Sequence, residues 1–257
     1  MSLRRLLDLS GKVALVTGGS RGLGLQMAEA LGEMGARVAI TARKAPELEL
    51  AAKRLESQGV EVLTVPVDLG RRENVAGTLD PVLARFGTVD VLVNNAGTTW
   101  GAPAEDYPAE AWDKVMRLNI DAMFFLSQAV AKHCMIPRRS GKIVNVASVA
   151  GLSGNPPGMA TIAYNASKGA AVNLTRALAV EWGRYDINVN AICPGFFPSK
   201  MTHGLLDAIG QKVIDGTPLS RLGGEEDLKG AVAFLSSEAS RHVTGQCLVV
   251  DGGASLW

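Results

Sequence analysis

The feature that most constrains the fold of this chain is a regular alternation of short apolar runs with longer stretches of helical periodicity. Several runs (VALVT, VDVLV and KIVNV) are apolar almost throughout, which is typical of parallel strands covered by helices on both faces. We expect strands at Val13–Thr17, Arg37–Thr41, Glu61–Val65, Val89–Asn94, Lys142–Ala147, Ile187–Cys193 and Gln246–Val250, and helices near 23–34, 46–57, 72–86, 108–133, 163–184 and 225–237. The pattern predicts a single-domain α/β fold over residues 1–257, a doubly wound parallel sheet of about seven strands.

Composition and charge exclude several classes of function. The 257 residues carry 26 Lys plus Arg against 25 Asp plus Glu, so the net charge of +1 gives no support for a nucleic-acid or anionic-membrane partner. The scattered Cys134, Cys193 and Cys247 have no metal-ligand spacing, and we expect free thiols in a reducing compartment and no metal. The chain shows no signal-peptide pattern and no apolar run of about 18 residues, so we expect a soluble cytoplasmic protein.

A glycine-rich turn joins the first expected strand to the first expected helix. Its GxxxGxG spacing lets the backbone turn tightly and approach a phosphate, which the N-terminus of the following helix attracts. In a βαβ chain this arrangement predicts a Rossmann-type dinucleotide site. The residues of this turn that we expect at the cofactor are Gly18, Ser20, Arg21, Gly22, Leu23 and Gly24.

The end of the second strand indicates which dinucleotide is bound. An NAD site usually has an acid here for the ribose 2′-hydroxyl, but this sequence has Arg43 and Lys44, with Arg21 in the glycine turn. Since basic side chains pair with a 2′-phosphate and an acid would repel it, NADP(H) is favoured over NAD(H). Solvated surface cations are the alternative interpretation.

Two further strand ends offer cofactor contacts. Asp68, followed by Leu69, comes after the third strand and can accept a hydrogen bond from the adenine amino group, or can simply begin a helix. The small residues of Asn95-Ala96-Gly97 follow the fourth strand and can let the backbone lie against the ribose, or can form a plain turn.

Tyr164 and Lys168 stand four residues apart in AYNASK, so on a helix their side chains share one face. A free phenol has a pKa of about 10, which a neighbouring cation lowers by stabilising the phenolate. Tyr164 can then exchange a proton with an alcohol or ketone near neutral pH. An ordinary helix with one Tyr and one exposed Lys is the alternative.

Two polar residues complete a candidate catalytic group. Ser148 follows the fifth strand, where its hydroxyl can hold a substrate oxygen or can serve as a turn or N-cap residue. Asn119 lies inside an expected helix, where it can hold a water that passes protons towards Lys168, or can be an exposed polar position.

In order and approximate spacing, TGGSRGLG, NNAG, Asn119, Ser148, YNASK and Cys193-Pro194-Gly195 resemble the short-chain dehydrogenase/reductase family, over almost the whole chain from Leu9 to Gly253. The resemblance implies a catalytic tetrad of Asn119, Ser148, Tyr164 and Lys168. Tyr164 is then the general acid in reduction and the base in oxidation, Ser148 orients the substrate oxygen, Lys168 binds the nicotinamide ribose and Asn119 anchors a water relay. Further cofactor contacts are expected from Pro194, Gly195, Phe197, Ser199 and Met201.

The sequence departs from the family pattern in the stretch before Tyr164, which is longer than in many relatives and contains Asn155-Pro156-Pro157-Gly158. We expect the substrate pocket to involve Ser148, Asn155, Met159, Tyr164, Phe196 and Leu205. The apolar segment 196–216 is expected to form a lid or an amphipathic helix packed on the core.

Within the family the chain is most similar to 3-oxoacyl reductases and to gluconate or polyol dehydrogenases. Arg138, Arg139 and Arg184 suggest a docking place for an acidic acyl carrier protein. The expected activity is ketone reduction with NADPH, with a 3-oxoacyl substrate first and a polyol, gluconate or secondary alcohol as the alternative. A catalytically silent dinucleotide sensor is an alternative of another class. Relatives assemble through their long helices and C-terminal segments, here Val249–Trp257, so we expect a homotetramer.

Overall fold

The computed structural model describes residues 2–156 and 158–256, so Pro157 of the expected substrate loop and the terminal Trp257 lie outside the described residues. Within that part of the chain the sheet has seven strands, all parallel, in the order β3-β2-β1-β4-β5-β6-β7. The strands are β1 (Val13–Thr17), β2 (Arg37–Ala42), β3 (Val62–Pro66), β4 (Val91–Asn94), β5 (Gly141–Val146), β6 (Ile187–Pro194) and β7 (Cys247–Val250). The predicted single-domain, doubly wound parallel sheet is therefore confirmed.

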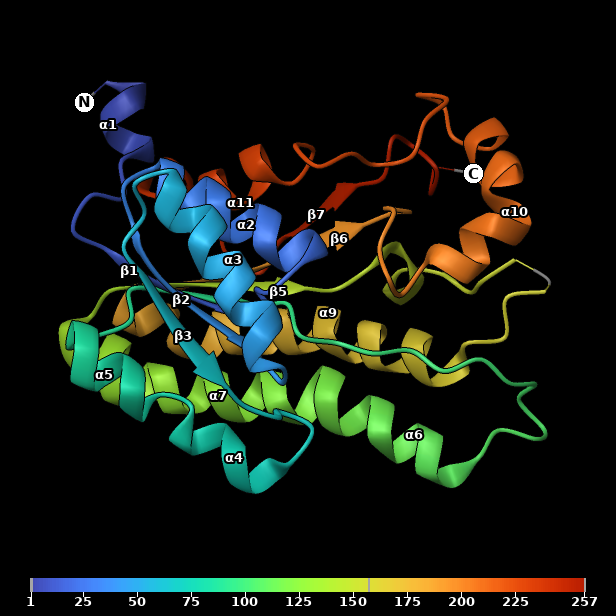
Figure 1. Cartoon of the computed structure of the whole chain (residues 1–257), viewed down its shortest axis with the longest axis horizontal. Coiled ribbons are helices and arrows are strands. Elements are labelled where there is room, and N and C mark those ends of the chain that lie inside the picture. Colours follow the sequence, from blue (N-terminus) through green and yellow to red (C-terminus); the bar gives the residue numbers. More distant parts are fainter. Residues whose placement is uncertain (1, 157, 257) are drawn as a thin grey trace.

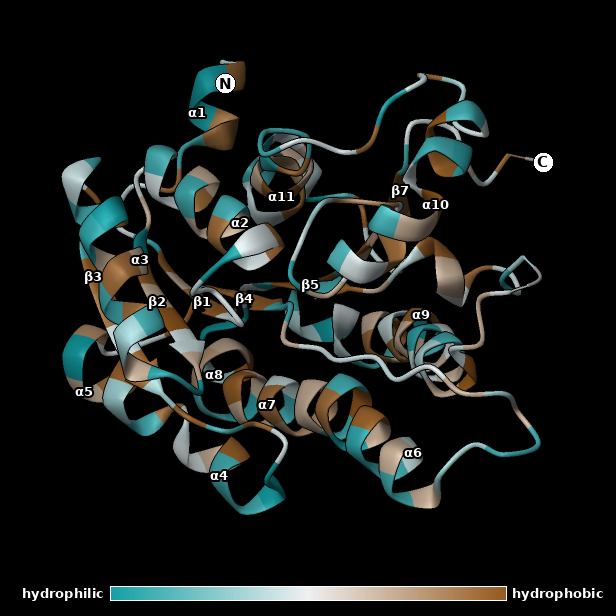
Figure 2. Cartoon of the chain, turned by 45° about the vertical axis from the view of Figure 1, so that its right-hand side comes forward, coloured by the Kyte–Doolittle hydropathy of each residue, from teal (hydrophilic) through white to brown (hydrophobic). Residues whose placement is uncertain are grey.

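Helices cover both faces of the sheet (Figure 1). One layer contains α2 (Gly22–Glu33), α3 (Ala45–Ser57) and α11 (Lys229–Ser236). The other contains α5 (Asp80–Phe86), α7 (Ala122–Val130) and α9 (Ile162–Trp182). Alternate residues of β1 serve the two layers, since Ala14 and Val16 pack in the first core and Val13 and Leu15 in the second. The strands form a mostly apolar layer between the helices (Figure 2).

The remaining helices are short or lie at the ends of the sheet. They are α1 (Leu3–Leu7), α4 (Arg72–Gly77), α6 (Ala109–Met116), η1 (Arg117–Asp121), η2 (Ala131–Met135), α8 (Ile136–Arg138), η3 (Val149–Gly151), η4 (Gly183–Tyr185), α10 (His203–Asp215) and η5 (Glu238–Ser240). The apolar stripe expected at 196–216 thus contains a helix, α10. It follows β6 and lies on the right in Figure 1, beyond the carboxyl ends of the strands.

One expected helix is divided in two. The sequence pattern predicted a single helix at 72–86, but α4 ends at Gly77 and α5 begins at Asp80. Pro81 explains the break, because its ring would clash with the carbonyl of Gly77 in a continuous helix and it donates no backbone hydrogen bond.

The order of the strands reverses between β1 and β4. From β1 the chain builds outward to β2 and β3, and from β4 it builds in the other direction to β7. Ligands of open α/β sheets bind beyond the carboxyl ends of strands at such a reversal. The ends of β1, β4, β5 and β6 therefore define where the site must lie.

Candidate active site

The glycine turn after β1 has the backbone geometry of a phosphate-binding loop. Gly18 and Gly22 have φ angles of +65° and +53°, a left-handed conformation that glycine adopts at little cost. A Cβ on Gly24 would clash with the carbonyl oxygen of Gly18, so the turn needs glycine there for close packing. Arg21 precedes α2, and its side chain makes no capping hydrogen bond to that helix. The first backbone N–H groups of α2 therefore remain available to an anion.

The end of β4 is fastened to this turn. The side chain of Asn95 donates to the carbonyl oxygens of Thr17 (2.8 Å) and Gly18 (3.2 Å). The hydroxyl of Thr17 accepts hydrogen bonds from the backbone N–H of Asn95 at 2.9 Å and of Ala96 at 3.0 Å. The two strand ends on either side of the reversal thus form one rigid unit. Asn95 has a structural task here that its sequence context did not reveal.

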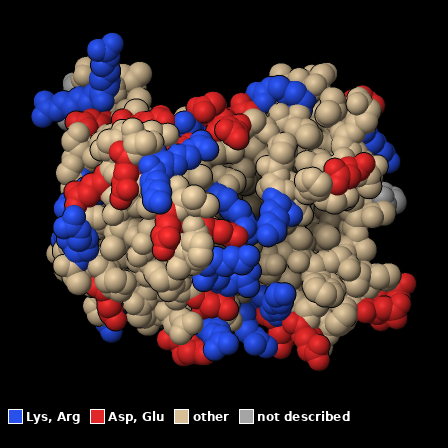
Figure 3. Space-filling model, viewed as in Figure 1, with Lys and Arg blue, Asp and Glu red and all other residues tan. Residues whose placement is uncertain are grey.

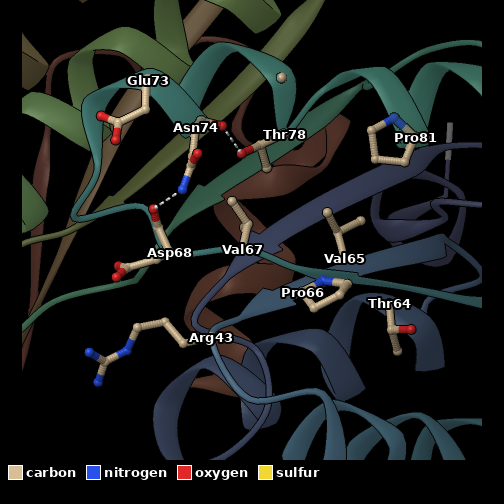
Figure 4. Close-up of a pocket in the computed structure, with 11 residues that line it drawn as sticks. Arg43, Thr64, Val65, Pro66, Val67, Asp68, Glu73, Asn74, Thr78 and Pro81 are labelled. Atoms are coloured by element: carbon tan, nitrogen blue, oxygen red, sulfur yellow. Dashed lines mark hydrogen bonds between the residues drawn. The ribbon is translucent and has the colours of Figure 1, made fainter.

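Two of the three basic residues predicted at the cofactor 2′-phosphate form ion pairs within the protein. Arg21 and Lys44 share one partner, Glu47, in the first turn of α3. Arg43 instead borders a cavity of about 620 Å³ together with Asp68, beside β3 and α4. Figure 4 shows Arg43 and Asp68 on the same side of this cavity. Glu47 was missed from the sequence, although its place three residues after Lys44 at a helix start is the spacing of an ion pair.

Tyr164 and Ser148 come together at the carboxyl end of β5. Ser148 caps η3, where its hydroxyl accepts a hydrogen bond from the backbone N–H of Ala150 at 3.1 Å. The same hydroxyl is close enough to the phenol of Tyr164, which projects from the first turn of α9, to lower the pKa of that phenol. Ser148 therefore serves both as the N-cap of η3 and as a neighbour of the Tyr164 phenol.

Lys168 lies one helical turn after Tyr164 and is buried, with 4% of its surface exposed. Its Nζ donates to the carbonyl oxygen of Val146 at 2.7 Å and lies 5.5 Å from the centre of the Tyr164 ring. Burial lowers the pKa of Lys168 to about 8. The alternative of an exposed lysine is excluded by this burial.

The pKa of Tyr164 differs from the sequence-based expectation. The neighbouring cation was expected to lower it, but burial raises the pKa of Tyr164 above its ordinary value, and the nearby hydroxyl of Ser148 opposes that rise only in part. In this structure the desolvation of the phenol outweighs any attraction from the ammonium. Tyr164 is therefore protonated at neutral pH.

Asn119 is fully buried, which excludes the exposed alternative. It lies in η1, a π-helical turn within the run of helices from α6 to α8; such turns are frequent at functional sites. Its side chain accepts from the backbone N–H of Thr98 (2.8 Å) and donates to the carbonyl oxygen of Thr98 (2.9 Å) and to Ser167 (3.0 Å). Asn119 thus joins the segment after β4 to the helix that carries Tyr164.

The segment after β6 divides between core and surface. Phe197 packs in the core against Gly223, so its aromatic side chain is not part of an open pocket. Ser199 is hydrogen-bonded to Thr202 at the start of α10, and Met201 is 45% exposed. A Cβ on Gly195 would approach Asp251 to 2.6 Å, so this turn is packed tightly against the C-terminal segment.

Asn155 does not offer its amide to a substrate. The side chain is turned towards α9, where it contacts Asn165 and Thr161. Asn165 was not identified from the sequence, because nothing in its neighbourhood distinguishes it from any other helical asparagine.

The three arginines expected at a carrier-protein surface lie at the opposite end of the sheet. Arg138 bonds Asp90 at 2.6 Å, immediately before β4, and Arg139 donates to the carbonyl oxygen of Arg184, immediately before β6. Tyr164 and Ser148 lie at the carboxyl ends of the strands. The arginines therefore do not border the site that a carrier would have to reach.

Among the residues that the structure describes, no helix is both long and apolar enough to cross a membrane. In the same residues no group of three or more His, Cys, Asp or Glu side chains is placed to hold a metal ion.

The fold and the site define the class of protein as a dinucleotide-dependent oxidoreductase. Residues 12–209 match the family model described as short chain dehydrogenase, and the chain belongs to that family. It is 42% identical to gluconate 5-dehydrogenase of Gluconobacter oxydans over 258 aligned residues, covering 100% of this chain and 99% of the relative. It is 38% identical to the 3-oxoacyl-(acyl-carrier-protein) reductase of Chlamydia trachomatis, covering 95% of this chain and 98% of the relative.

A solved relative has the same architecture. The crystal structure of a gluconate 5-dehydrogenase from Burkholderia cenocepacia, in complex with NADP and tartrate, superimposes with a TM-score of 0.93 at 36% identity. The alignment covers 100% of both chains. The chain is thus an oxidoreductase whose fold is shared with an NADP-bound relative over its full length.

Proposed function

We propose that this chain catalyses the NADP(H)-dependent interconversion of a ketone and a secondary alcohol, with a short polyhydroxy keto acid of the 5-ketogluconate class as its substrate. The observation that carries the reaction class is the grouping of Tyr164 with the buried Ser148 and the buried Lys168, whose Nζ lies 5.5 Å from the centre of the Tyr164 ring. The substrate class is supported by the full-length similarity to gluconate 5-dehydrogenase and by the hydroxy acid tartrate in the Burkholderia cenocepacia complex.

The residues of the chain fit a bound NADP(H). The left-handed Gly18 and Gly22 and the free N–H groups of α2 suit the pyrophosphate. The side chains of Arg21, Arg43 and Lys44 suit the 2′-phosphate, and Asp68 suits the adenine amino group. Gly97 suits the nicotinamide ribose, since a Cβ there would lie 3.7 Å from the Nζ of Lys168.

The tetrad residues divide the proton chemistry among them. NADPH supplies a hydride to the carbonyl carbon when it is bound. Tyr164 donates its phenolic proton to the carbonyl oxygen, and Ser148 holds that oxygen by a hydrogen bond. The raised pKa of Tyr164 keeps this proton in place at neutral pH, which suits reduction, whereas oxidation requires the phenolate and is favoured by higher pH. Lys168 binds the ribose, and Asn119 holds the relay by which Tyr164 regains its proton.

The segment 196–216 serves as the lid of the substrate pocket in this proposal. Met201 is exposed beside the start of α10, and Leu205 lies within that helix. The remaining pocket positions are Phe196 and Met159, while Phe197, Ser199, Pro194 and Gly195 contact the cofactor chiefly through their backbone. Asn155 shapes the pocket indirectly, since its amide is occupied within the protein.

A 3-oxoacyl substrate is the second candidate, and the similarity to the Chlamydia trachomatis reductase favours it. Docking of an acyl carrier protein through Arg138, Arg139 and Arg184 stays a prediction; within one chain these residues lie at the end of the sheet away from Tyr164.

We also propose a homotetramer in the cytoplasm. β7 is an edge strand whose Leu248 and Val249 are each 37% exposed. A second subunit packed on this edge would bury these apolar side chains. The three cysteines are unpaired thiols, as expected in a reducing compartment.

The test is a panel of ketones followed by the absorbance of NADPH. The panel contains 5-ketogluconate, an acetoacetyl thioester, an α-diketone and a simple cyclic ketone, each with NADPH and with NADH. The proposal predicts the highest kcat/KM with 5-ketogluconate and NADPH. A preference for the thioester would support the second candidate, and tight NADPH binding without turnover of any ketone would instead indicate a silent dinucleotide sensor.

A further inference from the structure

Glu47 lies between two of the three residues expected at the 2′-phosphate, Arg21 and Lys44. Its Oε2 lies 2.7 Å from Nη1 of Arg21, and its Oε1 lies 3.4 Å from Nζ of Lys44. The carboxylate is better shielded than its partners, since its side chain is 29% exposed against 50% for Arg21 and 63% for Lys44. One acid thus engages both a cation of the glycine turn and a cation that follows β2.

The charge balance of this cluster is positive. Burial would raise the pKa of Glu47, but the charges of Arg21, Lys44 and Lys200 and the hydrogen bond with Lys44 hold it below its usual range. Glu47 is therefore an anion at neutral pH, surrounded by three cations. Figure 3, in the same view as Figure 1, shows basic side chains gathered over the middle of the visible face, with acidic ones among them.

A phosphate monoester carries a charge of about −1.5 to −2 near neutral pH and forms its strongest bonds with guanidinium and ammonium groups. It would compete with Glu47 for the N–H groups of Arg21 and Lys44. NAD(H) has a hydroxyl at the same position, which imposes no such competition.

We propose that Glu47 is a specificity-determining residue that competes with the cofactor 2′-phosphate for Arg21 and Lys44, and so holds the preference for NADP(H) over NAD(H) below what the cations alone would give. This inference rests on the proposed use of NADP(H). It assigns to Glu47 a role opposite to that of the acid in an NAD-specific site, because Glu47 binds the cations rather than the ribose. The carboxylate also neutralises part of the cluster while no phosphate is engaged.

The test is the substitution Glu47→Gln, which keeps the shape of the side chain and removes its charge. Dissociation constants for NADPH and NADH are measured by calorimetry without substrate, at low and high salt. At low salt E47Q should bind NADPH about two- to fivefold more tightly than the unaltered protein, the scale of one exposed charge interaction, and should bind NADH unchanged. High salt should reduce the gain.

The matched control is Glu61→Gln. Glu61 pairs with Arg85 at 2.7 Å on the surface and precedes β3, at the end of the sheet away from the glycine turn. E61Q should change neither affinity. The double variant R21Q/E47Q should show less gain from the loss of Glu47 than E47Q does, because one of the contested cations is gone.

Weaker NADPH binding by E47Q would overturn the inference, since Glu47 would then orient the cations for the phosphate. An equal change for NADPH and NADH would overturn it as well. Failure of the proposed cofactor use has a different outcome, in which the unaltered protein binds NADPH no more tightly than NADH and E47Q does not alter that ratio.

Discussion

The side chains of Asn155 and Asn165 form a reciprocal pair of hydrogen bonds. Nδ2 of Asn155 lies 2.9 Å from Oδ1 of Asn165, and Nδ2 of Asn165 lies 3.0 Å from Oδ1 of Asn155. Asn165 also donates to the carbonyl oxygen of Ala150 at 3.0 Å. The loop between Ser148 and Tyr164 is thereby tied to the first turn of the helix that carries Tyr164.

Asn165→Ala should therefore raise the KM for the ketone at least about fivefold, because it removes the reciprocal pair and the bond to Ala150 and one lost hydrogen bond alone is of that scale, and it should leave the NADPH dissociation constant unchanged. The double variant with Asn155→Ala should show a smaller increase than the product of the two single effects, because both substitutions break the same pair. Steady-state kinetics and calorimetry measure these effects. As a control, Asn188→Ala removes an amide that pins residues 241 and 243 at the other end of the sheet, and it should lower the melting temperature without changing KM. An unchanged KM for N165A would contradict the assignment.

Gly18→Ala should weaken NADPH binding at least tenfold. A Cβ at Gly18 would lie 2.9 Å from Nδ2 of Asn95 and would also strain a left-handed backbone, for which φ is +65°. Gly11→Ala is the matched control, since Gly11 has φ of +78° and open space around it. Both variants should lose about 1 kcal/mol of stability, but only G18A should lose affinity in calorimetry. Equal affinity losses would mean that backbone strain alone, and not the phosphate turn, is responsible.

Burial of Lys168 predicts a pH dependence of stability. Its pKa falls from the ordinary 10.5 to about 8 in the folded chain, so between these values the unfolded chain binds more protons than the folded one. The free energy of unfolding should then rise with pH across this window, and the cost of burying the charge should be fully present below it. Compared with Lys168→Met, the free energy of unfolding of the unaltered protein should increase by about 3 kcal/mol from the low-pH to the high-pH end of this window. Urea denaturation at several pH values measures this difference, and a constant difference would contradict the burial of a protonated lysine.

Most of the fold was predictable because its determinants are local. Each strand is an apolar run bounded by polar or glycine-containing turns, and all seven were found at or near their positions. The break before Pro81 was missed, because one helix was expected at 72–86, although a proline inside a helix is itself a signal of such a break. The π-helical turn at Asn119 could not be predicted, because no change in the periodicity of the sequence accompanies it.

The parts of the site that escaped prediction depend on contacts between distant segments. The direction of the Tyr164 pKa shift follows from burial, which the spacing of two residues on a helix does not specify. The aromatic side chain of Phe197 packs against Gly223, and the three arginines lie at the end of the sheet away from Tyr164. Both arrangements are consequences of tertiary packing. Glu47 was within reach of the sequence, since its spacing from Lys44 is that of a helical ion pair.

The proposed assembly predicts that Val249→Asp disrupts it. Val249 is 37% exposed on the edge strand β7, and a charge there would be buried against a second subunit. Light scattering at micromolar concentration should show a tetramer for the unaltered protein and a smaller species for V249D. Leu50→Asp is the control, because Leu50 is 69% exposed on α3, away from β7. A monodisperse monomer of the unaltered protein would contradict the assembly.

The most direct test of the account is the turnover of Tyr164→Phe, a variant that lacks only the phenolic oxygen beside Ser148. Oxidation of NADPH with the best ketone of the panel is compared with the NADPH dissociation constant of the same preparation. We predict that kcat falls by about 10² or more while the dissociation constant stays nearly the same. Turnover close to that of the unaltered protein would contradict the assignment of Tyr164 as the acid of the reaction.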